Sequence, residues 1–206
     1  GQYFKWMAAD DTIDPMFLAS CLALLDQDPE AVLAYSKADF VRPSGQHWWT
    51  AEVLPDLSQA STAKRFQAAI SNFWCLEVFG LMRRDILEST SLIGSYYGSD
   101  KVLLAQLSLL GPFKVTHERF FHRRCHADQS SRLSKEERDL WIDSRNGKQP
   151  KLLRSRISLE LFKSVLGSPI SLEAKASCLE ILGLRFIRKI PFRIRYHFSK
   201  SAPNKV

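Results

Sequence analysis

The sequence is poor in cysteine, and its cysteines lie far apart. Four are present at intervals of about fifty residues, and no Cys-x-x-Cys pair occurs: Cys21, Cys75, Cys125 and Cys178. This spacing argues against a zinc ribbon or a disulfide framework. We therefore expect free thiols in a reducing compartment.

The sequence also lacks a long apolar run and several well-known catalytic motifs. No stretch reaches the roughly 20 apolar residues that cross a bilayer, and there is no Walker-type loop, G-x-S-x-G elbow or low-complexity tract. With 45% hydrophobic and 25% charged residues, the composition is that of a globular protein with one sizeable core. We expect a cytoplasmic protein, peripheral at most at the inner face of the membrane.

Charge is distributed unevenly along the chain. From Lys148 to Val206 there are thirteen lysines and arginines against three glutamates, whereas acidic residues slightly outnumber basic ones before Lys148. The stretch Asn146–Pro150 breaks the pattern between the two parts. We therefore predict an α/β domain over residues 1–146 and a mostly helical, basic C-terminal appendage over residues 147–206.

An acidic corner close to the N-terminus organises the rest of the chain. The apolar run Tyr3–Ala9 predicts a strand buried on both faces, and Asp10 and Asp11 then fall at its carboxyl end, where α/β sheets bind ligands. Helical spacing over residues 17–25 predicts a helix directly afterwards. The two acids are either ligands or loop residues favoured by the dipole of that helix.

The run from Tyr3 to Asp11, followed by Pro15, resembles the middle of family 2 glycosyltransferases of the GT-A fold. In that family a strand ends in a short acidic motif that holds a divalent metal on the diphosphate of a nucleotide-sugar. The resemblance implies that Asp11, with Asp10 beside it, binds Mn²⁺ or Mg²⁺ and that Trp6 contributes to substrate binding. The third acid of the fuller family motif is replaced by Ala8.

A second acidic site, Asp100, lies at the start of a predicted helix over residues 100–110. Asp100 follows the Gly-rich, aromatic stretch 94–99, and an acid in the first turn favours the helix dipole without any catalytic role. The same stretch is similar to the segment in which inverting family members place their catalytic base, with Ser99 at the position of the first acid. The resemblance thus implies that Asp100 is the base and that Tyr97 contacts substrate.

Two further stretches carry a likeness to the family. The predicted strand over residues 112–121 leads into a basic segment, where Arg123 or Arg124 could clamp phosphate and His126 could bind the metal. A solvated basic loop is the alternative. Gly80 lies in a Phe-Gly-x-x-Arg-Arg stretch that in the family lines the acceptor side, although packing explains a strand glycine equally well.

Several other segments have a predicted structure without an assigned role. Trp48 and Trp49 form either a lip for a sugar acceptor or a local core under a loop. Strands are predicted over residues 32–41 and 75–84, and helices over residues 60–73, from Ser134, over residues 152–166 and from Ser171.

Cations alternate with large apolar side chains over residues 185–198 of the basic tail. This pattern suits an anionic membrane surface, a nucleic-acid groove or the solvated face of a docked appendage. We favour the solvated face, keep the membrane surface as the alternative and expect no nucleic acid.

The resemblance covers roughly the first 130 residues and corresponds to the C-terminal half of a GT-A domain. It implies an inverting transferase that moves a sugar from a nucleotide-diphosphate-sugar to the hydroxyl of a sugar or lipid-linked acceptor. It also implies that the nucleoside-binding half lies outside this chain, so we expect the fragment to be inactive alone. The alternative is a non-catalytic basic module that binds a membrane surface or a polyanion.

Overall fold

The computed structural model describes residues 1–51, 54, 57, 60–127, 129, 132–142 and 153–187. The strands, in chain order, are β1 (Tyr3–Phe4), β2 (Thr12–Ile13), β3 (Leu33–Val41), β4 (His47–Ala51), β5 (Leu81–Arg83) and β6 (Phe113–Arg124). The helices are α1 (Phe17–Gln27), α2 (Thr62–Ser71), the 3₁₀ helix η1 (Leu76–Phe79), α3 (Arg84–Glu88), α4 (Ser99–Leu110), α5 (Lys135–Ile142), α6 (Leu153–Gly167) and α7 (Leu172–Ile187).

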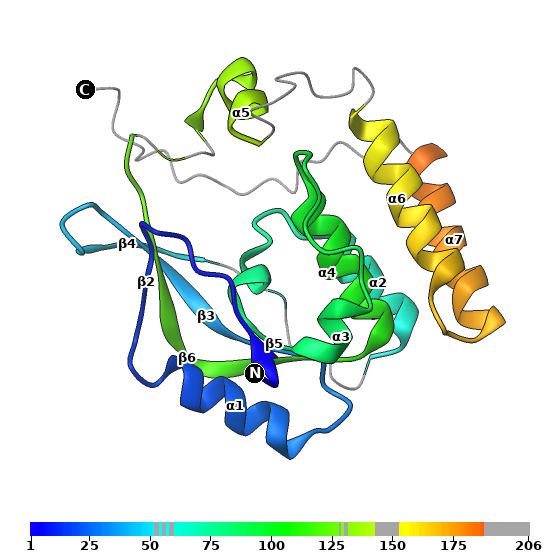
Figure 1. Cartoon of the computed structure of the whole chain (residues 1–206), viewed down its shortest axis with the longest axis horizontal. Helices are drawn as coiled ribbons and strands as arrows, with labels where there is room; N and C mark the ends of the chain where they lie inside the picture. Colours follow the sequence, from blue (N-terminus) through cyan, green and yellow to red (C-terminus); the bar gives the residue numbers. More distant parts are fainter. Residues whose placement is uncertain are drawn as a thin grey trace.

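The described strands form one mixed sheet in the order β1-β5-β3-β6-β2 (Figure 1). β3 and β6 pair in parallel at its centre, and every other pairing is antiparallel. β5 pairs with the start of β3 and β4 with its end, on the same side of that strand. The chain therefore has a mixed α/β fold, as its sequence predicts at this coarse level.

Helices cover both faces of the central strands (Figure 1). On one face, Phe17, Cys21 and Leu25 of α1 pack against alanines of β3. On the other, Leu103 and Leu107 of α4 pack against the opposite side of β3. Because both faces of β3 are covered, seven of its nine residues are buried, and its burial does not follow a simple alternation.

The C-terminal helices α6 and α7 form a hairpin that packs on α2 and α4 (Figure 1). Leu161 and Val165 of α6, with Cys178 and Leu182 of α7, share a buried cluster with Phe66, Ile70, Val102 and Leu109. The described part of the predicted appendage therefore shares a core with the α/β domain. The boundary at residues 146 and 147 and most of residues 185–198 lie outside the described residues.

The predicted N-terminal strand was wrong in length and position. Only Tyr3 and Phe4 are in a strand, which lies at the edge of the sheet, and Phe4 is 39% exposed. The pairing stops early because the partner strand, β5, spans only Leu81–Arg83. Asp10 and Asp11 thus lie in the connection from β1 to β2, not at the end of a buried central strand.

Two other segments also differ from the sequence-based prediction. Trp48 and Trp49 lie in β4, where a bulge in the pairing to β3 obscures the strand alternation. The predicted strand over residues 75–84 is divided into η1 and the short β5. Cys75 has a φ of 52°, a left-handed conformation that turns the chain before η1.

Candidate active site

The acidic corner between β1 and β2 meets the carboxyl end of β6. The Arg124 N–H donates a hydrogen bond of 3.0 Å to Asp11 Oδ1, across 113 residues of sequence. His126 Nε2 lies 2.8 Å from Asp10 Oδ2, across 116 residues. Asp10, Asp11 and His126, the three residues proposed as metal ligands from the sequence, thus lie at the same corner, but their side chains do not form a three-ligand metal group.

Burial and several nearby charges act on the pKa of the Asp11 carboxyl group. Only 8% of the residue is exposed, and burial raises the pKa of this carboxyl, an effect that the Arg124 N–H partly offsets. Asp10 raises this pKa further, whereas the cations of Arg123 and Lys5 lower it. The corner therefore combines two carboxylates with cations that lie close enough to act on them.

Lys5 contributes a partly desolvated cation beneath this corner. Its Nζ donates to the Trp6 carbonyl at 2.9 Å and lies 4.8 Å from the centroid of the Phe17 ring. Burial lowers the Lys5 pKa to about 8, and Cys21 and Asp11 act in the opposite direction. The sequence did not indicate a role for Lys5, because this residue becomes partly buried only when α1 packs over the sheet.

The oxygen ligands at the corner suit a hard divalent cation only if water or a substrate supplies further ligands. No group of three or more His, Cys, Asp or Glu side chains converges in the part of the chain that the structure describes. Magnesium sites commonly use one or two carboxylates and take their other ligands from water and substrate phosphates. The acids of this corner fit such an open site, and they do not form a closed protein cage.

The two arginines at the end of β6 are held differently. Arg124 Nη1 donates to the Pro43 carbonyl at 3.2 Å, so part of this guanidinium is engaged with the backbone. The Arg123 guanidinium lies over the rings of Phe40 and Trp74, 5.4 and 5.5 Å from their centroids. Arg123 also lowers the Asp11 pKa, so it is the guanidinium better placed to meet an anion at the corner.

Asp100 lies in the first turn of α4, as expected from the sequence. Gly98 precedes the helix with a φ of 84°, a conformation that favours glycine, and Asp100 Oδ1 accepts the Lys101 N–H at 2.8 Å. Asp100 remains half-buried rather than enclosed. The next residue, Lys101, is 7% exposed and donates through Nζ to the Asn72 carbonyl.

The first turn of α4, which carries Asp100, and the carboxyl end of β6 lie toward the same end of the sheet (Figure 1). α4 ends at Gly111, which packs against Val32 at the start of β3, and β6 begins two residues later beside Leu33. α4 therefore runs back along the sheet, and its first turn lies toward the ends of β3 and β6. Arg123, near the first acidic corner, lies over Trp74, and Asp100 contributes to raising the pKa of the thiol of Cys75, the residue after Trp74.

The remaining residues proposed for substrate binding have other contacts. Trp6 packs edge-to-face on Phe4, with ring centroids 4.5 Å apart. The Tyr97 ring is 47% exposed and lies 4.2 Å from the Arg138 guanidinium of α5. A Cβ on Gly80 would lie 2.6 Å from the Ala34 carbonyl oxygen, so close packing on β3 accounts for this glycine without a ligand.

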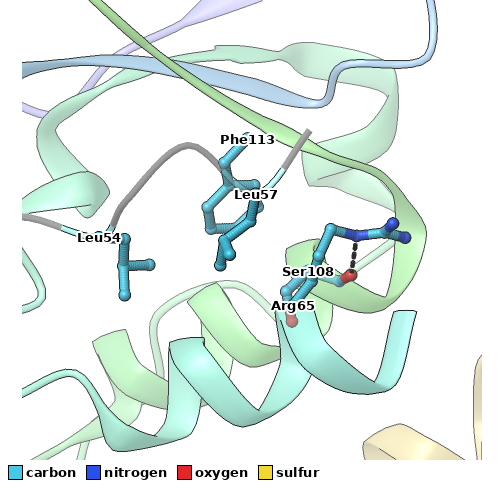
Figure 2. A pocket seen from close by; sticks show the side chains of 5 residues that line it. All are labelled: Leu54, Leu57, Arg65, Ser108 and Phe113. Carbon is cyan, nitrogen blue, oxygen red and sulfur yellow. Dashed lines mark hydrogen bonds between the residues drawn. The ribbon is translucent and has the colours of Figure 1, made fainter. Parts of the chain in front are cut away.

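Two hollows among the described residues lie away from these residues. Figure 2 shows one between Leu54, Leu57, Arg65, Ser108 and Phe113, where Arg65 Nε donates to the Ser108 carbonyl at 3.1 Å. Its volume of about 10 Å³ holds at most one water molecule. The other hollow lies beside β1 and α3, and neither is lined by Asp10, Asp11 or Asp100.

Three further observations bear on function. The chain matches no protein-family model and no curated protein. Among the described residues, no helix combines the length and the apolar character needed to span a bilayer. Any assignment of function therefore rests on the geometry of the chain itself.

Proposed function

We propose that this chain is part of a GT-A-type inverting glycosyltransferase. Its reaction would transfer a sugar from a nucleotide-diphosphate-sugar to the hydroxyl of a sugar or lipid-linked acceptor. The observation that carries the proposal is the meeting of Asp10 and Asp11 with the Arg123–His126 segment. Acids, a guanidinium and an imidazole at one corner suit the recognition of a diphosphate with its counter-ion.

In this proposal the acidic corner handles the leaving group. Asp11 and Asp10 would hold a divalent cation, which neutralises the charge that develops on the departing diphosphate. Arg123 would bind the phosphate oxygens from the side of β6. His126 would keep the Asp10 carboxylate oriented, since the two side chains already lie 2.8 Å apart.

Asp100 would act at the other side of the reacting centre. In an inverting displacement the acceptor oxygen forms a bond to the anomeric carbon while the bond to the diphosphate breaks, and the hydroxyl must lose its proton. A carboxylate within hydrogen-bond reach can accept that proton. Asp100 has this capacity because it is half-buried and its Oδ1 accepts the Lys101 N–H at the helix start.

The test is calorimetric titration of the full-length protein with a panel of UDP-, GDP- and dTDP-sugars, with and without Mn²⁺. We expect binding that requires the metal and that is lost in Asp11→Ala. Asp85→Ala is the matched control, because Asp85 is an exposed acid on α3. Absence of binding by every donor, or equal binding by Asp11→Ala, would contradict the proposal.

A second candidate function is a non-catalytic module on an anionic membrane surface. The observation in its favour is a stripe on α6, where Leu159, Phe162 and Leu166 are 51%, 45% and 47% exposed at helical spacing. Lys163 lies within the same stretch, and the C-terminal part of the sequence is strongly basic. An amphipathic face next to positive charge is typical of interfacial binding.

Vesicle sedimentation separates the two candidates. Binding to phosphatidylserine vesicles that weakens steeply with salt and is lost in Phe162→Ser supports the module. Leu18→Ser is the control, since Leu18 is equally exposed, at 48%, on α1. Membrane binding by a protein that also binds a nucleotide-sugar would indicate a peripheral transferase rather than a module.

A further inference from the structure

Aromatic rings from three parts of the chain form a cluster at the end of the sheet. Phe40 of β3 lies 5.0 Å from Trp49 of β4 and 5.0 Å from Trp74, measured between ring centroids. Trp49 and Trp74 are 6.1 Å apart, and Phe73 packs edge-to-face on Trp74 at 5.0 Å. We call these four residues the aromatic platform.

The platform is partly open to solvent. Phe40 is only 4% exposed and forms its base, whereas Trp49 and Phe73 are 37% and 51% exposed. Burial of a large ring contributes more to stability than most single interactions. A cluster that leaves this much ring surface exposed therefore offers an apolar surface to a ligand.

One side of the platform adjoins the acidic corner. The Arg123 guanidinium lies over both Phe40 and Trp74, and the N–H of the following residue, Arg124, donates to Asp11 Oδ1 at 3.0 Å. A ligand stacked on the rings would thus have Arg123 at its edge. The polar groups of the ligand would then face the acidic corner that we propose to hold the diphosphate.

The other side is connected to the second acidic site. Phe73 and Trp74 lie in the loop after α2, and the Asn72 carbonyl of this loop accepts Lys101 Nζ from α4. Lys101 directly follows Asp100. The loop that presents two of the four rings is therefore anchored to the helix that carries the proposed base.

We propose that the aromatic platform binds the saccharide part of the acceptor by stacking. A pyranose ring has a face of C–H groups, which are attracted to the electron-rich faces of aromatic rings, and a rim of hydroxyls that pair with charged groups. Rings flanked by Arg123 and the two acidic sites match that combination of an apolar face and a polar edge. This inference rests on the proposed function and identifies its acceptor as a carbohydrate.

The experiment follows the indole N–H groups of the ¹⁵N-labelled protein by NMR during titration with cellotetraose, chitotetraose, maltotetraose and mannotetraose. Five tryptophans provide the signals, and single substitutions assign them. We expect the Trp49 and Trp74 signals to shift with at least one sugar. The Trp141 signal is the internal control and should stay in place, because Trp141 is 68% exposed on α5 and outside the platform.

Variants then link the shifts to stacking. Phe73→Ala should weaken sugar binding about tenfold. Because Phe73 is largely exposed, we expect this substitution to destabilise the fold only slightly. Trp141→Ala should leave the affinity unchanged. Because no donor is present, failure here leaves the result of the donor titration unaffected, and the two proposals can fail separately.

Two results would overturn the inference. One is the absence of any shift at Trp49 and Trp74 with all four sugars at high concentration. The other is a dimer in light scattering that Trp49→Ala dissociates, because the platform would then be covered by a second copy of the chain.

Discussion

The imidazole of His126 lies 2.8 Å from the carboxylate of Asp10, although 116 residues separate them in the chain. Asp10 lies between β1 and β2, and His126 lies just beyond β6. The pairing arises because β2 and β6 are neighbours in the sheet, with Thr12 opposite His122. This relationship joins the two segments whose residues we propose to hold the diphosphate.

Removing the imidazole tests that pairing. His126→Gln should weaken Mn²⁺-dependent donor binding by about 10- to 100-fold, the usual effect of losing a group that orients a metal ligand. His117→Gln provides the control, because His117 is exposed on β6, the strand that precedes His126. Equal donor affinities for the two variants, measured by calorimetry, would remove His126 from the site.

Asp100→Asn should separate chemistry from binding. The amide cannot accept the acceptor's proton, so turnover by the full-length enzyme should fall by about 10²- to 10⁴-fold, while donor affinity stays unchanged. The measurements are steady-state turnover and donor titration. Retained turnover would show that Asp100 only stabilises the start of α4.

Gly80→Ala tests whether this glycine is needed for packing. The new Cβ would lie 2.6 Å from the Ala34 carbonyl oxygen, so we expect a loss of about 1–3 kcal/mol in the free energy of unfolding. Gly183→Ala is the control, since it lies inside α7 with nothing within 4 Å and should stabilise the protein by about 0.5–1 kcal/mol. Urea denaturation measures both. An unchanged stability in Gly80→Ala would return Gly80 to the list of substrate contacts.

Stability should depend on pH through Glu77. This residue is fully buried, accepts the Leu54 N–H at 3.0 Å and a second hydrogen bond from Asn72, and burial raises its pKa from 4.5. Because the pKa of Glu77 is higher in the folded state than in the unfolded state, the protonated carboxyl stabilises the folded protein. This contribution is complete below pH 4.5 and is lost as the pH rises through the folded-state pKa.

Glu77→Gln removes that titration. The free energy of unfolding of the wild type, relative to the variant, should therefore be largest near pH 4.5 and smaller at about pH 8. Denaturant titrations at several pH values provide the comparison. A difference that grows with pH would mean that the carboxylate is more stable than the acid in this site.

The four cysteines should differ in reactivity. Burial raises the pKa of Cys21 and of Cys75 to about 12, and Cys178 is fully buried. Cys125 is half-exposed at the end of β6. Alkylation by iodoacetamide at about pH 8, followed by mass spectrometry, should modify Cys125 first because the thiolate is the reactive form. Earlier modification of Cys75 would indicate that the loop after α2 opens readily.

Local sequence was sufficient for the long, regular elements. Helix α1, strand β3, helix α4 and strand β6 follow from residue spacing and from the signals that end helices, such as Gly111. It also identified the chemistry available at the acidic corner, because carboxylates, arginines and imidazole are recognisable without a fold.

The tertiary structure decided which of those groups meet. β1 lies at an edge of the sheet, where it pairs with the short β5, and the platform exists only because β4 and the loop after α2 converge on Phe40. The helical hairpin of α6 and α7 shares a buried core with α2 and α4, and its composition does not predict these contacts. Periodicity reports on neighbours a few residues apart, whereas these contacts join residues tens to more than a hundred positions apart, and their geometry depends on the path of the whole chain.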